Sequence, residues 1–109
     1  MTALLKNNLD TIKDLCKKHH VNSLYVFGSA AREIDFNEKS DVDFLVTFNS
    51  LPVNTNEEVF YIADNYENLQ KELQTIVNRK VDLIRENNIK NKFLKYFINK
   101  EKELLYGIS

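Results

Sequence analysis

Two aspartates stand one residue apart at the start of an apolar segment, in the run Ser40-Asp41-Val42-Asp43-Phe44-Leu45-Val46. Side chains at positions i and i+2 of an extended strand point to one face, so Asp41 and Asp43 should lie side by side, about 6 to 7 Å apart along the backbone. Two unpaired carboxylates at this distance repel each other and raise one pKa. Mg²⁺ relieves that cost, because it prefers oxygen ligands and also binds phosphates. The segment therefore predicts a strand that carries a metal site.

Apolar spacing in the first half of the chain predicts one helix and two strands. Ala3 to His19 carries apolar residues every three or four positions, which is typical of an amphipathic helix. Ser23 to Phe27 and Val42 to Phe48 are β-prone and are expected to be strands. The polar stretch from Ala30 to Lys39 should form a turn of helix and a loop, and Leu51 to Asn54 marks the exit from the second strand.

The second half predicts a long helix, a strand and a final helix. Thr55 and Glu58 fit a capping box that opens a helix ending near Val77. Val81 to Ile84 follows as a third short strand. The final helix should end near Gly107, with an apolar stripe formed by Phe93, Leu94, Phe97, Ile98, Leu104 and Leu105. The predicted fold is a single α+β domain over residues 1–109, with a short mixed β-sheet of about three strands flanked by helices in the order αββαβα.

Length and composition limit the class of protein. A chain of 109 residues suits one compact domain, and 43% hydrophobic with 28% charged residues is ordinary for a globular protein. No apolar run is long enough to cross a bilayer, and Met1 to Asp10 lacks the pattern of a secretory signal, so we expect a cytoplasmic protein without a membrane partner. Cys16 is the only cysteine, which excludes an intrachain disulfide and favours a small core residue.

The charge balance argues against strong nucleic-acid binding. Fifteen basic and sixteen acidic residues give a net charge of -1, which leaves little excess to neutralise phosphates. His19 and His20 are adjacent without nearby cysteines, and a solvated pair at a helix end explains them better than zinc ligation does. A solvated helix face is likewise the simpler interpretation of Lys90, Lys92, Lys95, Lys100 and Lys102.

A third aspartate, Asp82, also interrupts an apolar strand. Because Asp is depleted inside strands, Asp41, Asp43 and Asp82 together indicate a carboxylate triad. If their strands are neighbours, the triad forms a two-metal site, which activates an attacking oxygen and stabilises the charge that develops on phosphate. The alternative is that Asp41 caps a turn and the others lie on exposed edges. The triad predicts phosphoryl or nucleotidyl transfer.

A glycine and a serine follow the first predicted strand. Gly28 lets the backbone turn tightly and approach a ligand, and Ser29 adds a hydroxyl beside amides that can face an anion. Taken alone, the pair could simply be a loop. Arg32 could bind phosphate oxygens, and an ion pair with Glu33 or Asp35 is the alternative.

Three motifs resemble the minimal nucleotidyltransferase (MNT) pattern of the DNA polymerase β-like superfamily, and the resemblance spans roughly Leu5 to Tyr106. They are Gly28-Ser29-Ala30-Ala31-Arg32, Ser40-Asp41-Val42-Asp43 and Val81-Asp82-Leu83. The resemblance implies a Mg²⁺-dependent nucleotidyltransferase. It implies metal binding by Asp41, Asp43 and Asp82, of which Asp82 also prepares the acceptor hydroxyl, and binding of the nucleoside triphosphate by Gly28, Ser29 and Arg32.

Many MNT proteins of this size act as antitoxins beside a helical HEPN ribonuclease toxin. The resemblance therefore implies transfer of AMP from ATP onto a tyrosine of such a partner protein. One alternative is an antitoxin that acts by binding alone, and its only support in the sequence is Glu33, where the family usually has glycine. Another is an enzyme whose acceptor is a small hydroxylated molecule or an RNA end.

Overall fold

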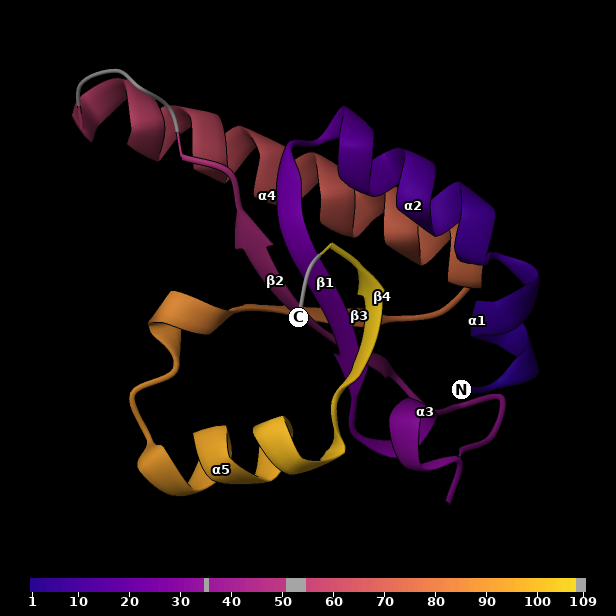
Figure 1. The fold of residues 1–109 in the computed structure, drawn as a ribbon. Coiled ribbons are helices and arrows are strands. Elements are labelled where there is room, and N and C mark those ends of the chain that lie inside the picture. Colours follow the sequence, from indigo (N-terminus) through magenta and orange to yellow (C-terminus); the bar gives the residue numbers. More distant parts are fainter. Residues whose placement is uncertain (35, 51–54, 108–109) are drawn as a thin grey trace.

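A four-stranded mixed sheet organises this chain, whose computed structural model describes residues 1–34, 36–50 and 55–107 (Figure 1). The strands lie in the order β3-β2-β1-β4. β1 is antiparallel to β2 and β4, whereas β2 and β3 are parallel. The elements in chain order are α1 (Ala3–Asn7), α2 (Leu9–Lys18), β1 (Val21–Phe27), α3 (Ser29–Arg32), β2 (Val42–Phe48), α4 (Thr55–Val77), β3 (Val81–Arg85), the 3₁₀ turn η1 (Glu86–Asn88), α5 (Lys92–Glu101) and β4 (Glu103–Tyr106).

The two faces of the sheet are covered unequally. Helices α2 and α4 lie together on one side of the sheet in Figure 1, and α5 lies on the other. The first face holds the main core, in which Val26, Phe44 and Leu83 pack with apolar residues of the two helices. The second face holds a smaller cluster around Phe27, Leu45 and Ile98. Because strand residues alternate between faces, polar side chains two positions from this cluster lie beside it.

The edge strand β3 is held by side chains of α4. Gln74 accepts a hydrogen bond from the Val81 N–H at 3.3 Å, and Gln70 donates to the Val81 carbonyl at 3.1 Å. The Tyr66 hydroxyl donates to the carbonyl of Leu83. These three helix residues are four positions apart and so share one face of α4. The contacts satisfy backbone groups that an edge strand leaves unpaired, and they fix the position of β3.

The α+β class and the central elements are confirmed, with one strand more than expected. Strand β2 and the end of α4 lie where the apolar spacing predicts them. Leu104 and Leu105, predicted on the final helix, belong instead to β4, which pairs with the edge of β1. A short apolar run is compatible with both the helical and the strand period. Here pairing with β1 makes the run a strand, in which Leu105 is buried and Leu104 is exposed. The capping box proposed for Thr55, and the exit at 51–54, lie outside the described side chains.

The apolar stripe predicted for the final helix is wrong for most of its members. Of the residues of α5, only Ile98 is buried, and it packs on Phe27 and Leu45. Phe93, Leu94 and Phe97 are 78%, 47% and 61% exposed. The second face of the sheet offers only a small apolar cluster, so α5 buries one position against it.

The N-terminal helix also differs from its prediction. It is divided at Asn8, whose N–H and side chain bond to carbonyls of the preceding turn. Cys16 is a buried core residue, as expected, and burial raises the pKa of its thiol to about 12. His19, predicted to be solvated, is buried and contacts the Glu72 carboxylate of α4. Within the described residues, no helix is both long and apolar enough to span a bilayer.

Candidate active site

The register of the sheet brings three predicted site residues into one row. Asp43 on β2 pairs across the parallel ladder with Asp82 on β3. On its other side, Asp43 pairs with Phe27, the last residue of β1. Gly28 follows Phe27 directly, so it lies beside Asp43. The row Asp82, Asp43, Gly28 therefore runs from β3 through β2 to the residue that follows β1, at one end of the sheet.

Asp43 lies in an environment that disfavours its charged form. Burial contributes most, followed by a hydrogen bond with the Asp82 carboxyl and the negative charges of Asp82, Asp41 and Glu101. Together they raise the pKa of Asp43 to about 6. A carboxyl with this environment in a polar cluster is typical of a functional site.

Asp41 lies one residue before β2 rather than on the strand, but it still belongs to the acidic cluster. The Nζ atom of Lys80 lies 3.7 Å from Oδ2 of Asp41 and 3.9 Å from Oδ1 of Asp82. This lysine was not singled out from the sequence, although its position two residues before Asp82 is compatible with the same face. Lys80 partly offsets the repulsion among the carboxylates, and at 68% exposure it can move away.

Arg79 holds the loop that leads into Asp41. Its guanidinium donates to the carbonyls of Asn37 at 2.8 Å and Ser40 at 3.2 Å. The same group lies over the ring of Phe36, 4.7 Å from the centroid. Arg79 therefore anchors the backbone that leads into Asp41, and this anchoring keeps the loop beside β3.

Gly28 is required at its position by both backbone conformation and space. Its φ of 72° and ψ of -153° fall in a region that is essentially restricted to glycine. A Cβ atom added there would overlap Oδ2 of Asp43 and lie 3.3 Å from its Cγ. The missing side chain of Gly28 is what allows the Asp43 carboxylate to approach the turn.

The turn after Gly28 places Ser29 and Arg32 on the short helix α3. The Nη1 atom of Arg32 donates to Oε2 of Glu101 at 2.7 Å. Among the described residues, this ion pair replaces the pair with Glu33 that the sequence suggested as an alternative. Asp35, the other partner considered, lies outside the described residues. Glu33 points to the N-terminal ammonium at 3.4 Å and adopts a left-handed φ of 60°. That conformation explains why glycine suits this position.

The acidic cluster is not a closed metal cage. Among the residues that the structure describes, no three acidic, histidine or cysteine side chains form a ready binding group for a metal ion. Asp43 and Asp82 form a close pair, and Asp41 stands beside them across Lys80. Mg²⁺ commonly takes only one or two carboxylates and completes its shell with water and phosphate oxygens. The donor set fits a cation that is shared with a phosphorylated substrate.

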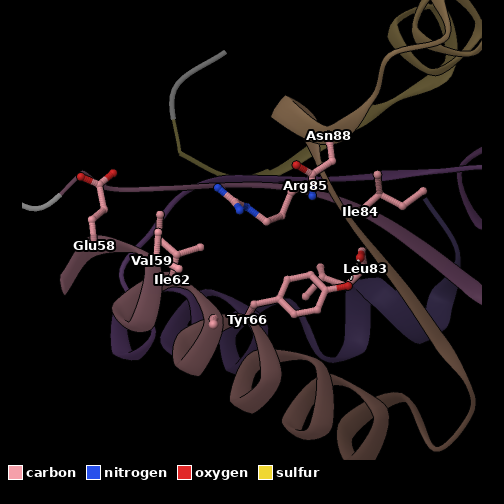
Figure 2. A pocket seen from close by; sticks show the side chains of 9 residues that line it. Glu58, Val59, Ile62, Tyr66, Leu83, Ile84, Arg85 and Asn88 are labelled. Atoms are coloured by element: carbon pink, nitrogen blue, oxygen red, sulfur yellow. Dashed lines mark hydrogen bonds between the residues drawn. The ribbon is translucent and has the colours of Figure 1, made fainter. Parts of the chain in front are cut away.

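A separate groove of about 750 Å³ runs between α4 and the edge of β3 (Figure 2). Val59, Ile62 and Tyr66 approach it from the helix, and Leu83 and Arg85 from the strand. None of the residues predicted from the sequence to form the site lines this groove. The acidic row is therefore distinct from this groove.

Replacing Gly28 with alanine should disturb the acidic row. Gly28→Ala forces a glycine-only conformation and pushes the new methyl group onto Asp43, so the free energy of unfolding should fall by about 1 to 3 kcal/mol. Chemical denaturation measures this change. Ser29→Ala is the matched control, because it keeps the backbone and removes only a hydroxyl. Equal stability of Gly28→Ala and the unaltered protein would contradict the assigned turn geometry.

The raised pKa of Asp43 predicts a pH-dependent effect of Asp43→Asn. The folded state disfavours the Asp43 carboxylate, so this group stabilises the protein below its unfolded pKa, and that contribution is lost as pH rises through about 6. In the absence of divalent cations, Asp43→Asn should therefore raise Tm at pH 7.5, and the gain should shrink as pH falls towards 4. A gain that is constant with pH would argue against the crowded environment.

Comparison with known proteins places the chain in a family. Residues 10–109 match the family model described as polymerase beta, nucleotidyltransferase. A protein of Methanocaldococcus jannaschii named "Putative protein adenylyltransferase MJ0128" is 34% identical over 106 residues, which cover 90% of this chain and 96% of that protein.

Solved structures share the fold. "Structure of putative minimal nucleotidyltransferase" superposes with a TM-score of 0.70 at 24% identity, covering 91% of this chain and 90% of that chain. A toxin-antitoxin crystallised with AMP-PNP gives 0.67 at 19% identity, covering 94% and 75%. A tri-AMPylated Shewanella oneidensis HEPN toxin in complex with MNT antitoxin gives 0.62 at 18% identity, covering 94% and 72%. At these identities the superpositions establish the architecture alone. Because the family model spans nearly the whole sequence, the chain belongs to the polymerase beta nucleotidyltransferase family, with the fold of a minimal nucleotidyltransferase.

Proposed function

We propose that this protein transfers AMP from ATP to a tyrosine hydroxyl of a partner protein, and that the partner is a HEPN-type toxin which the transfer neutralises. The observation that carries the proposal is the row Asp82, Asp43, Gly28, which sets a pair of carboxylates beside a backbone turn with no side chain. Family membership supports nucleotidyl transfer. The relative named as an adenylyltransferase and the complex of an MNT antitoxin with an AMPylated HEPN toxin support the acceptor class.

In the proposed reaction, Gly28 and Ser29 hold the triphosphate at the turn, Gly28 by leaving room for it and Ser29 through its amide and hydroxyl, and Arg32 binds phosphate oxygens with N–H groups that Glu101 does not use. Asp41, Asp43 and Asp82 would hold Mg²⁺, which when bound would supply positive charge against the phosphates and let the carboxylates remain ionised side by side. The acceptor oxygen forms a bond to the α-phosphorus as the bond to pyrophosphate breaks. Asp82 orients the acceptor hydroxyl and takes up its proton. The products are the AMP adduct and pyrophosphate.

The proposal is tested by incubating the protein with ATP, Mg²⁺ and its HEPN partner and measuring AMP adducts by intact-protein mass spectrometry. The double variant Asp41→Asn, Asp43→Asn should reduce adduct formation at least about a hundredfold, because it removes the charges that hold the cation. Asp10→Asn, Asp14→Asn makes the same chemical change on exposed positions of α2 and should be fully active. Persistent modification by the first variant would eliminate the chemistry. A variant that forms no adduct yet still neutralises the toxin would support an antitoxin that acts by binding alone.

One surface favours a protein as the acceptor over a small molecule. Exposed apolar side chains gather on α5, whose last residue contacts Gly28 of the acidic row, and we name this the α5 surface: Phe93, Leu94, Tyr96 and Phe97. Isolated exposed apolar residues are ordinary, whereas four on one ten-residue helix indicate an interaction site. The segment from 90 to 102 carries five lysines and one glutamate, in a chain of net charge -1. We therefore infer that the α5 surface receives an apolar patch of the partner that is bordered by acidic residues.

The double variant Phe93→Ala, Phe97→Ala should weaken binding of the HEPN partner at least about tenfold in isothermal titration calorimetry, since truncated exposed aromatics often carry an interface. Phe60→Ala is the matched control, because Phe60 is 77% exposed on α4 and Phe93 is 78% exposed on α5. Stability should change little in either case. If the double variant bound the partner as tightly as the unaltered protein, the α5 surface would not be part of the interface. Labelled ATP would then test transfer to a small hydroxylated molecule or to an RNA end.

A further inference from the structure

Glu101, the last residue of α5, bridges the helix to the turn at Gly28. Its Oε1 accepts a hydrogen bond from the Gly28 N–H at 2.9 Å, and its Oε2 accepts one from Nη1 of Arg32 at 2.7 Å. Its side chain is only 24% exposed. Both carboxylate oxygens are therefore used, and both partners belong to the proposed triphosphate site.

The position of Glu101 near an anion site requires explanation. Its negative charge also reaches Asp43, where it contributes to the raised pKa. A carboxylate in this place would repel phosphates if it stood alone. Two roles are conceivable: Glu101 occupies the phosphate site and must leave, or it orients donors that contact phosphate with other atoms.

The remaining donors favour the orienting role. The first backbone bonds of α3 run from the N–H groups of Ala31 and Arg32 to the Gly28 carbonyl. In the described part of the chain, the amides of Ser29 and Ala30 have no backbone acceptor, but Ala30 is fully buried, so the partly exposed Ser29 supplies the donor of this turn that Glu101 does not use. The Arg32 guanidinium carries five N–H groups, and the bond to Glu101 uses one nitrogen. A triphosphate can thus bind without displacing Glu101.

We propose that Glu101 is a positioning residue for the nucleotide: it fixes the Gly28 turn and the Arg32 guanidinium from behind and stays bound to both while the triphosphate is present. This inference rests on the proposed function in that the ligand is ATP. The carboxylate reduces the freedom of a long arginine side chain, so less entropy is lost when the nucleotide binds.

The sign of one measurement separates the two roles. Removing a negative charge beside an anion site strengthens anion binding if charge alone matters, and so does removing a group that blocks the site. Loss of a positioning contact weakens binding instead. Glu101→Gln keeps the shape of the side chain, removes its charge and places an amide donor against either the Gly28 N–H or the Arg32 guanidinium.

We expect Glu101→Gln to lower the affinity for Mg²⁺-ATP about tenfold in isothermal titration calorimetry without partner protein, which corresponds to the loss of one charged hydrogen bond. Glu101→Asp keeps the charge but is too short to reach both donors, so it should also lose affinity. Glu103→Gln is the matched control, since Glu103 contacts the N-terminal ammonium at 3.3 Å and neither Gly28 nor Arg32. Its affinity should stay within about twofold. Unchanged or tighter binding by Glu101→Gln would overturn the positioning role.

A second measurement does not depend on transfer activity. The chain has only two glycines, Gly28 and Gly107, so their amide signals are readily followed in a ¹⁵N-labelled sample. The Gly28 amide should shift in Glu101→Gln and Glu101→Asp but not in Glu103→Gln, and in the unaltered protein ATP should leave its protection from exchange intact. Loss of that protection with ATP would show that Glu101 is displaced. If the unaltered protein failed to bind ATP, both the proposed function and this inference would be overturned. If it bound ATP and the Glu101 variants bound ATP with the same affinity, the inference alone would be overturned.

Discussion

The close pairing of two half-buried carboxyl groups on adjacent strands is the constraint around which the candidate site is arranged. Asp43 and Asp82 face each other because β2 and β3 pair in parallel, and that pairing is fixed by the buried apolar residues on the opposite face. Side chains of α4 hold the edge of β3 through its backbone, which keeps the Asp82 carboxyl beside that of Asp43. The unfavourable interaction between the two carboxyl groups therefore remains at the site, and the Lys80 ammonium offsets it only in part. Positive charge placed between the two carboxyl groups would relieve this cost, which is why the arrangement is compatible with the Mg²⁺ of the proposed function.

Much of the arrangement of the candidate site could be predicted from local sequence, because its residue types are unusual at their positions. An aspartate inside an apolar strand is unusual, and Asp43 and Asp82 share the row that such placement suggested. Gly28 stands at a strand end, where a turn is expected, and its conformation requires glycine. Strand β2 and helix α4 are long enough for their apolar periods to be unambiguous. Local information was sufficient wherever one side chain or one period decided the outcome.

Local information failed where tertiary pairing decides. Leu104-Leu105 fits a helix as well as a strand, and only the free edge of β1 makes it β4. Glu101 contacts Gly28 across 73 positions of the chain, and no short motif predicts such a contact. Glu33 stands where the family resemblance leads one to expect glycine, and its backbone is left-handed, so this residue carries a conformational cost that glycine would not.

Helix α5 joins the two halves of the proposed function. It is attached to the body of the protein by the burial of Ile98 and, at its last residue, by the bonds of Glu101 to the Gly28 turn and Arg32. Its outer side is the α5 surface. A partner that binds this surface with different affinity in two positions of the helix necessarily changes the population of the ordered turn. If the proposed function holds, linkage requires that ATP change the affinity for such a partner by the same factor, and α5 is the element through which the two binding events would be coupled.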